Sequence, residues 1–98
     1  PFTEIGNNTI FWSGNHLGHH SKVGDHNFIS SHVVISGSVT LGNNIFIGVN
    51  STLRDSINIA DETLIGAGAI IMKDTEFREV YVPQRTKPIA KQSHEVGF

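Results

Sequence analysis

Between Ile5 and Glu76, large apolar residues recur at every sixth position, without a gap or an insertion. These lead positions are Ile5, Phe11, Leu17, Val23, Ile29, Ile35, Leu41, Ile47, Leu53, Ile59, Ile65 and Ile71. The fourth residue after each lead is mostly small or β-branched, as at Ser21, Val39 and Thr63. An α-helix would need apolar residues three or four apart, and a half-buried strand would need strict alternation. A period of six sustained over the chain instead indicates a β-helical solenoid.

Each group of six residues is predicted to form one short strand and one tight turn. Three such hexads close one triangular coil of about 18 residues, so the chain should make about four coils. Residues three hexads apart should then stack in the interior, as in the column Phe11, Ile29, Ile47 and Ile65. Glycine follows the lead residue in six hexads, where we expect it to permit close turns and positive φ. These glycines are Gly6, Gly18, Gly24, Gly42, Gly48 and Gly66.

The repeat stops after Glu76, which predicts two parts. Residues 1–76 should form the β-helix domain, and residues 77–98 a C-terminal extension. The extension contains Pro83 and Pro88, and we expect it to be irregular apart from a short extended piece at Val80–Val82. The chain enters the repeat almost at once, which suggests a fragment that lacks an N-terminal region.

Composition narrows the classes of function. The 98 residues carry a formal net charge of −2, with a pI near 6.3, which argues against nucleic acid or a membrane surface as partner. No apolar run approaches membrane length and no signal peptide is visible, so a cytoplasmic location is expected. The absence of cysteine excludes disulfides, a cysteine nucleophile and thiolate metal sites.

Five of the six histidines are clustered in one segment of the chain, from His16 to His32. A metal site is the first interpretation to test. His20, His26 and His32 each stand three places after a lead residue, so they should occupy three successive corners of a coil. Corners of a triangle face away from one another, and no two histidines are three hexads apart, so none stacks on another. We therefore expect no metal site.

The segment GNHLGHHS, from Gly14 to Ser21, suits acyl transfer from a thioester better. That reaction needs a base whose pKa lies near the working pH, placed beside the incoming hydroxyl or amine. It needs no covalent enzyme intermediate, which agrees with a chain that has no cysteine. Backbone N–H groups at glycine-rich turns can hold the oxyanion.

Three segments extend this interpretation: LGHHSKVGDHNFIS, SGSVTLGNNIFIGVNS and LIGAGAII. Over Leu17 to Lys73 the chain resembles the hexapeptide-repeat acyltransferases, in particular the sialic-acid O-acetyltransferases and bacterial amino-sugar N-acetyltransferases. The resemblance implies an all-β, left-handed parallel β-helix, which is an exception to the right-handed crossover rule. It also implies acetyl-CoA as co-substrate, a sugar or nucleotide-sugar acceptor, and a homotrimer with active sites between neighbours.

The resemblance also assigns residues to roles. The base in those relatives stands two places after a lead residue, which here is His19. His20 follows, where the relatives usually have an acidic residue that orients the base, and His16 is a second candidate to orient or replace it. By analogy, the coenzyme A groove is lined by the backbone of three residues: Gly37, Val49 and Ala67.

Other functions of the same solenoid stay open at this point. γ-Class carbonic anhydrases share the fold but use two histidines five apart, and no two histidines here have that spacing. A structural, trimerising β-helix without catalysis is the main alternative. Ice binding would need a regular array of threonines, and a nucleotidyltransferase would keep its chemistry in another domain. The histidine cluster favours an acetyl-CoA-dependent sugar O- or N-acetyltransferase.

Within the repeat, three aromatic residues fall outside the lead register. They are Trp12, Phe28 and Phe46. Because the solenoid is narrow, we expect part of this apolar surface to be exposed on a single chain. Exposed apolar surface of this kind usually marks an interface, which agrees with the expected homotrimer.

Overall fold

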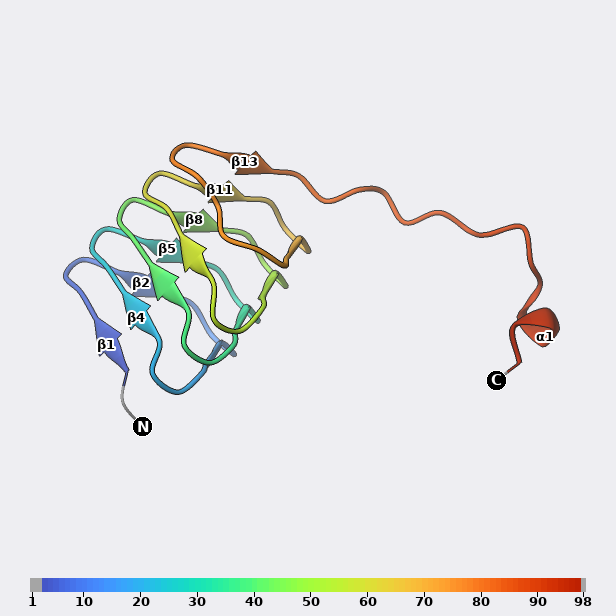
Figure 1. Ribbon diagram of the computed structural model, residues 1–98, viewed down its shortest axis with the longest axis horizontal. Helices are drawn as coiled ribbons and strands as arrows, with labels where there is room; N and C mark the ends of the chain where they lie inside the picture. Colours follow the sequence, from blue (N-terminus) through green and yellow to red (C-terminus); the bar gives the residue numbers. More distant parts are fainter. Residues whose placement is uncertain (1–2, 98) are drawn as a thin grey trace.

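The computed structural model describes residues 3–97 and shows a left-handed parallel β-helix, as predicted (Figure 1). Its strands are two residues long, and each hexad contributes one strand. The strands form three sheets, each with parallel strands, and each sheet is named here after one of its strands. The β4 sheet contains β1 (Glu4–Ile5), β4 (Lys22–Val23), β7 (Thr40–Leu41) and β10 (Asn58–Ile59). The β5 sheet contains β2 (Ile10–Phe11), β5 (Phe28–Ile29), β8 (Phe46–Ile47), β11 (Leu64–Ile65) and β13 (Val80–Tyr81). The β6 sheet contains β3 (His16–Leu17), β6 (Val34–Ile35), β9 (Thr52–Leu53) and β12 (Ile70–Ile71).

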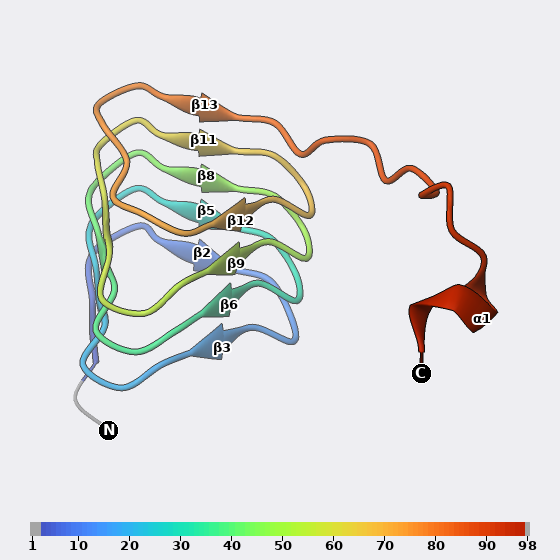
Figure 2. The ribbon, with the colours of Figure 1, turned by 45° about the vertical axis from the view of Figure 1, so that its right-hand side comes forward.

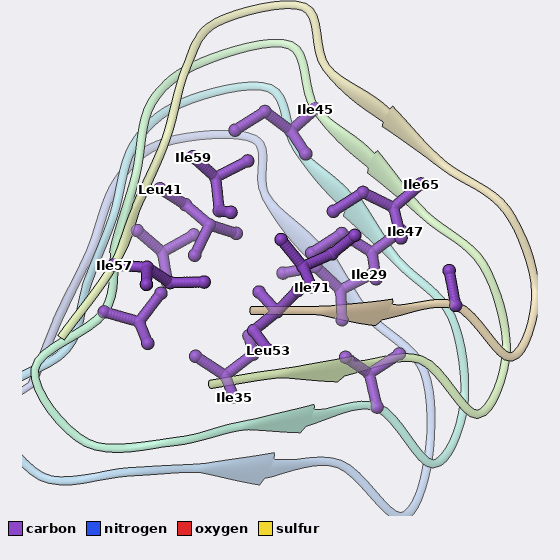
Figure 3. Packing of buried hydrophobic residues seen from close by; sticks show 14 residues of the cluster. Ile29, Ile35, Leu41, Ile45, Ile47, Leu53, Ile57, Ile59, Ile65 and Ile71 are labelled. Atoms are coloured by element: carbon purple, nitrogen blue, oxygen red, sulfur yellow. The ribbon is translucent and has the colours of Figure 1, made fainter. Parts of the chain in front are cut away.

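The lead residues fill the inside of the triangle, as the period of six predicts (Figure 3). In the β5 sheet, Phe11 pairs with Ile29, and Ile47 with both Ile29 and Ile65, so residues three hexads apart stack as expected. Burial depends on these neighbours: Ile29 and Ile47 are fully buried. Ile5, in the first coil, is 53% exposed because it has a stacking partner on one side only.

The glycines that follow the lead residues were expected to have positive φ, and this prediction is wrong. Positive φ occurs three places after the lead, where residues other than glycine have φ between 54° and 61°. None of the glycines directly after a lead has positive φ. Their role is close approach: a Cβ on Gly48 would lie 2.5 Å from the Ala67 nitrogen of the next coil. Glycine is needed there because adjacent coils touch through their backbones.

Polar ladders join successive coils. At the corner before the β5 sheet, Asp25 Oδ1 accepts the Asn7 N–H at 2.6 Å, and Asp61 Oδ1 accepts the Asn43 N–H at 2.7 Å. Inside, the buried Asn27 accepts the Ile45 N–H through Oδ1 at 2.7 Å. Among the described residues, every buried side-chain nitrogen and oxygen has a hydrogen-bond partner. The ladders satisfy polar groups that would otherwise destabilise the narrow core.

Strand β13 lies beyond Glu76, where the sequence repeat stops. Its Tyr81 pairs with Ile65, whereas the period would place Pro83 there, so the last coil is shorter than the others and falls out of the period. We keep the division into residues 1–76 and 77–98 as a proposal, in which the extension begins with a strand that closes the β5 sheet. After β13 the chain runs away from the β-helix to the short helix α1 (Ser93–Val96) (Figure 2).

Acid should weaken this last coil through Glu79. The Tyr81 hydroxyl donates to Glu79 Oε1 at 2.5 Å, and the Glu76 N–H donates to the same oxygen at 2.7 Å. The tyrosine bond and then the backbone bond lower the pKa of Glu79 below 4.5, while the bond to Glu79 is the main reason that the pKa of Tyr81 rises to about 12. A carboxyl whose pKa is lower in the folded state stabilises it above the unfolded pKa, and this contribution is lost as the pH falls.

Glu79→Gln should therefore flatten the acid side of the stability profile. Thermal unfolding measured between about pH 6 and pH 3 should show a smaller loss of Tm for Glu79→Gln than for the wild type. Glu4→Gln, which removes an exposed carboxylate from the outer face of β1, is the control and should follow the wild type. Parallel curves for Glu79→Gln and the wild type would contradict this role.

Candidate active site

The predicted base lies at the corner that links the β6 sheet to the β4 sheet. This His19 corner consists of residues 18–21, 36–39, 54–57 and 72–75, one turn from each coil. Gly18 is buried, whereas His19 and His20 are exposed. A Cβ on Gly18 would lie 2.5 Å from the Gly37 nitrogen, so only glycine lets the two turns pack this closely.

The backbone around His19 is held by the next coil. The Gly18 N–H donates to the Ile35 carbonyl at 2.7 Å, and the Ser38 N–H donates to the His19 carbonyl at 2.8 Å. The buried Ser21 hydroxyl donates to the Ser36 carbonyl at 2.9 Å. The imidazole of His19 therefore projects from a fixed turn toward the outside, as a base that meets an external substrate must.

Gly37 lies directly above His19 on this corner and differs from the other turn glycines. Within 4 Å, a Cβ at this position would meet one atom, the His19 carbonyl oxygen at 3.5 Å, which is an ordinary contact. Its φ is not in the left-handed region. Neither packing nor backbone conformation requires glycine here, so the lack of a side chain leaves open space beside His19.

The backbone N–H of Gly37 is also available. At the neighbouring corner, the equivalent N–H groups of Asn7, Asp25 and Asn43 donate to a carboxylate or amide oxygen of the next coil. The residue above Gly37 is Asp55, and its carboxylate instead lies 3.9 Å from Arg54 Nε. Within residues 3–97, no hydrogen bond from the Gly37 N–H is found, so it can donate to a ligand.

The other two candidate histidines have different positions. His16 points outward from strand β3 and is exposed. His20 occupies the left-handed turn position, with φ of 61°, as do His26 and His32 with φ of 59° and 57°. Histidine tolerates this conformation better than most residues do, which gives all three a structural role. As predicted, the three stand at successive corners.

The second part of the predicted site lies at the corner between the β5 and β6 sheets. A hollow of about 380 Å³ opens there. It is lined mainly by apolar and small side chains: Trp12, Ser30, Ser31, Phe46, Gly48, Val49 and Ala67. The structure thus brings Val49 and Ala67 together, one coil apart. The lining residues Trp12, Phe46, Ser30 and Ser31 were not predicted as ligand-binding.

Gly37 does not join Val49 and Ala67 in this hollow. The turns before and after the strands of the β6 sheet lie at its opposite ends (Figure 2). The hollow is lined by the turns before these strands and His19 lies in a turn after them, so one chain does not assemble all the candidate residues into one pocket. The spacing explains this, because two hexads separate Gly37 from Val49, and only three hexads return the chain to the same corner. The predicted site is therefore divided between two corners.

The structure was also searched for metal-binding groups and membrane-spanning helices. Within residues 3–97, no three His, Asp or Glu side chains are grouped closely enough to hold a metal ion. No helix in this part of the chain is long and apolar enough to cross a membrane.

Comparison with known proteins agrees with the repeat. Residues 2–37 match the family model described as bacterial transferase hexapeptide (six repeats), so the chain carries the hexapeptide repeat that its sequence predicts. A search of curated protein sequences finds no match.

Solved structures of acetyltransferases are among those that match the fold. Serine acetyltransferase isoform 3 from Entamoeba histolytica, in complex with cysteine, is 18% identical with a TM-score of 0.47, over 85% of this chain and 38% of that one. The acetyltransferase domain of PglB from Neisseria gonorrhoeae is 16% identical with a TM-score of 0.45, over 82% and 48%. The chain spans less than half the length of either.

Proposed function

We propose that this chain transfers an acetyl group from acetyl-CoA to a hydroxyl or amine of a sugar or nucleotide-sugar, with His19 as general base. One observation carries the proposal: His19 is exposed on a rigid turn beside Gly37, whose N–H is free and whose missing side chain the fold does not require. A base, a backbone donor and open space are the three elements that direct acyl transfer needs. The cytoplasmic location expected from the sequence is part of this proposal.

The reaction follows from these groups. His19 takes the proton from the acceptor hydroxyl or amine as its oxygen or nitrogen attacks the thioester carbonyl carbon. The Gly37 N–H holds the developing oxyanion. The carbon–sulfur bond then breaks, and the proton on His19 passes to the leaving coenzyme A thiolate. His20 and His16 are candidates to orient the imidazole, since each is exposed and close to His19 in the sequence.

The hollow suits the pantetheine arm of acetyl-CoA. Val49 and Ala67 lie on adjacent coils, so an extended chain can follow the corner from one to the other. Their small or apolar side chains leave room for it, and the hydroxyls of Ser30 and Ser31 supply polar groups at its edge. A mainly apolar hollow with few polar groups is typical of a small-molecule site.

The two corners can act together only across copies of the chain. We propose a homotrimer in which the His19 corner of one copy faces the hollow of its neighbour. A head-to-tail contact of this kind forms a closed ring of three copies when each copy is rotated by a third of a turn from the last. Each active site would then take its base and oxyanion donor from one copy and its pantetheine groove from the next.

Mixing two inactive variants tests this arrangement. His19→Asn removes the base, and Ala67→Trp fills the hollow, so each trimer alone should release little coenzyme A. Co-refolding the two chains in equal amounts should restore about a quarter of the wild-type sites in a closed ring. Light scattering should report a trimer for each. A monomer, or a mixture no more active than its components, would contradict a shared site.

Gly37→Leu tests the open space beside His19. The side chain should enter that space and lower acetyl transfer by about 10–100-fold, while the Tm should stay close to the wild-type value because a Cβ there meets no obstacle. Gly48→Ala is the matched control and should lose about 1–3 kcal/mol of stability through overpacking. Full activity in Gly37→Leu would show that the space is not used.

A structural, trimerising β-helix without catalysis is the second candidate. The exposed apolar residues Trp12 and Phe46, at 60% and 43% exposure, favour it because they would serve an interface equally well. The two functions differ in one respect: a structural module would form the trimer and release no coenzyme A with any acceptor.

A further inference from the structure

The outer face of the β5 sheet is apolar on every strand. The outward residues, here called the apolar stripe, are Ile10, Phe28, Phe46, Leu64 and Val80. Phe28 and Phe46 stack with ring centroids 5.5 Å apart, and Trp12 meets Phe28 edge-on at 5.5 Å. The equivalent face of the β4 sheet is polar, with Glu4, Lys22, Thr40 and Asn58. The outer face of the β6 sheet is mixed, with His16, Val34, Thr52 and Ile70. Among the described strands, only the β5 sheet is therefore apolar along its whole outer face, and contiguous exposed apolar surface marks a contact site.

One edge of the apolar stripe is acidic. The turns that lead into the β5 sheet carry Asp25, Asp61 and Glu62, and Glu79 directly precedes β13. Arg78 is the basic residue at this edge and pairs with Glu62 at 3.1 Å. Asp25 and Asp61 each use Oδ1 for a backbone N–H, which leaves their charge in place. A partner for this surface should therefore be apolar with basic groups to one side.

Residues 84–92, here called the tail, have that character. The tail runs away from the β-helix (Figure 1), and in the described structure no hydrogen bond links it to the sheets. Alternate residues of an extended segment share one face, which groups Arg85, Lys87 and Ile89 together. The chain bends at Ala90 and Lys91, so Lys91 follows directly after this face. Ile89 is 69% exposed. Pro88 supports an extended conformation of this segment.

We infer that the tail of one copy lies across the apolar stripe of a second copy. Ile89 would cover the stacked rings of Phe28 and Phe46. The stems of Lys87 and Lys91 would pack on the aromatic rings, with their ammonium groups toward the acidic edge. The tail leaves its own stripe at β13 and points away from it (Figure 1), which favours a second copy.

The dimensions agree with this contact. The six residues 84–89, which precede the bend at Ala90 and Lys91, span about 20 Å when extended, and five strands about 4.8 Å apart span about 19 Å. The tail is therefore long enough to cross the whole stripe. Phe46 and Trp12 also line the hollow proposed for pantetheine, so the two surfaces overlap. The inference does not depend on acetyl transfer, because cross-linking reports contact between the chains and not activity.

Disulfide cross-linking tests the contact directly, because the chain has no cysteine of its own. Chains of all 98 residues with Phe46→Cys are mixed with mass-tagged chains of the same length with Ile89→Cys, co-refolded and oxidised mildly. The expected product is a disulfide-linked heterodimer at about ten times the yield given by Thr40→Cys with Ile89→Cys. Thr40 is the matched control, since it occupies the equivalent outward position on the β4 sheet. Leu64→Cys replaces Phe46→Cys if that variant does not fold.

Three further outcomes decide the inference. Adding Lys87→Glu and Lys91→Glu to the tail should reduce the heterodimer yield several-fold, and an unchanged yield would overturn the charge pairing. Equal yields from Phe46→Cys and Thr40→Cys would overturn the contact. In the double variant Phe46→Cys/Ile89→Cys, a disulfide found by mass within a single chain would show that the tail folds back on its own sheet, and would overturn the second copy as its partner.

Discussion

His19→Asn is expected to lower acetyl-transfer turnover by about 10²–10⁴-fold, the usual effect of losing a general base. Asparagine keeps a polar side chain at the exposed turn but cannot accept the acceptor's proton. Binding of acetyl-CoA should change little, because the proposed groove is built around Val49 and Ala67 on another corner. Turnover is measured by release of free coenzyme A, and binding by calorimetry on the same sample.

The neighbouring histidines provide the controls for this prediction. His16→Asn and His20→Asn should keep the fold, since His16 is exposed and asparagine suits the left-handed turn at His20. Each should lower turnover less than His19→Asn does, and His26→Asn should have little effect. If His20→Asn or His16→Asn abolishes turnover while His19→Asn stays active, the assignment of the base is wrong.

Ile47→Ala is expected to cost about 2–5 kcal/mol of unfolding free energy. Ile47 is fully buried between Ile29 and Ile65 on adjacent coils, and the backbone ladders on both sides limit collapse into the cavity. Denaturant unfolding at one fixed protein concentration measures the loss. Ile70→Ala makes the same chemical change on the outer face of β12, where the side chain is 67% exposed, and should cost well under about 1 kcal/mol. Equal losses would contradict the stacked-column account of stability.

The strands and the core could be predicted because the period of six determines which residues share a face. The columns through Phe11, Ile5 and Leu17 were predicted by counting three hexads along the chain, and the structure confirms each of them. Strand β13 breaks this count, so periodicity alone did not align Tyr81 with Ile65. Local composition suggested only an extended piece there.

The turns were predicted less well. The glycines after the lead residues suggested positive φ, but the left-handed position is three places after the lead. Asparagine, serine and histidine recur there, and their tolerance of this conformation was the available signal. That signal also accounts for the positions of His20, His26 and His32, which the sequence presents as part of one histidine cluster.

The candidate site was predictable in its residues but not in its geometry. The count of three hexads places Val49 below Ala67, and the structure shows both in one hollow. Sequence did not show that Trp12 and Phe46 line that hollow, because outward side chains carry no periodic signal. It also did not show that Gly37, unlike Gly48, has room for a side chain, since that depends on contacts between coils.

The most direct test of the central claim is release of free coenzyme A from acetyl-CoA by the wild-type chain, with a panel of amino sugars and nucleotide-linked sugars. The account predicts release that depends on the acceptor and falls by about 10²–10⁴-fold in His19→Asn. A trimer of intact fold that releases no coenzyme A with any acceptor, or releases it equally well without His19, would contradict it.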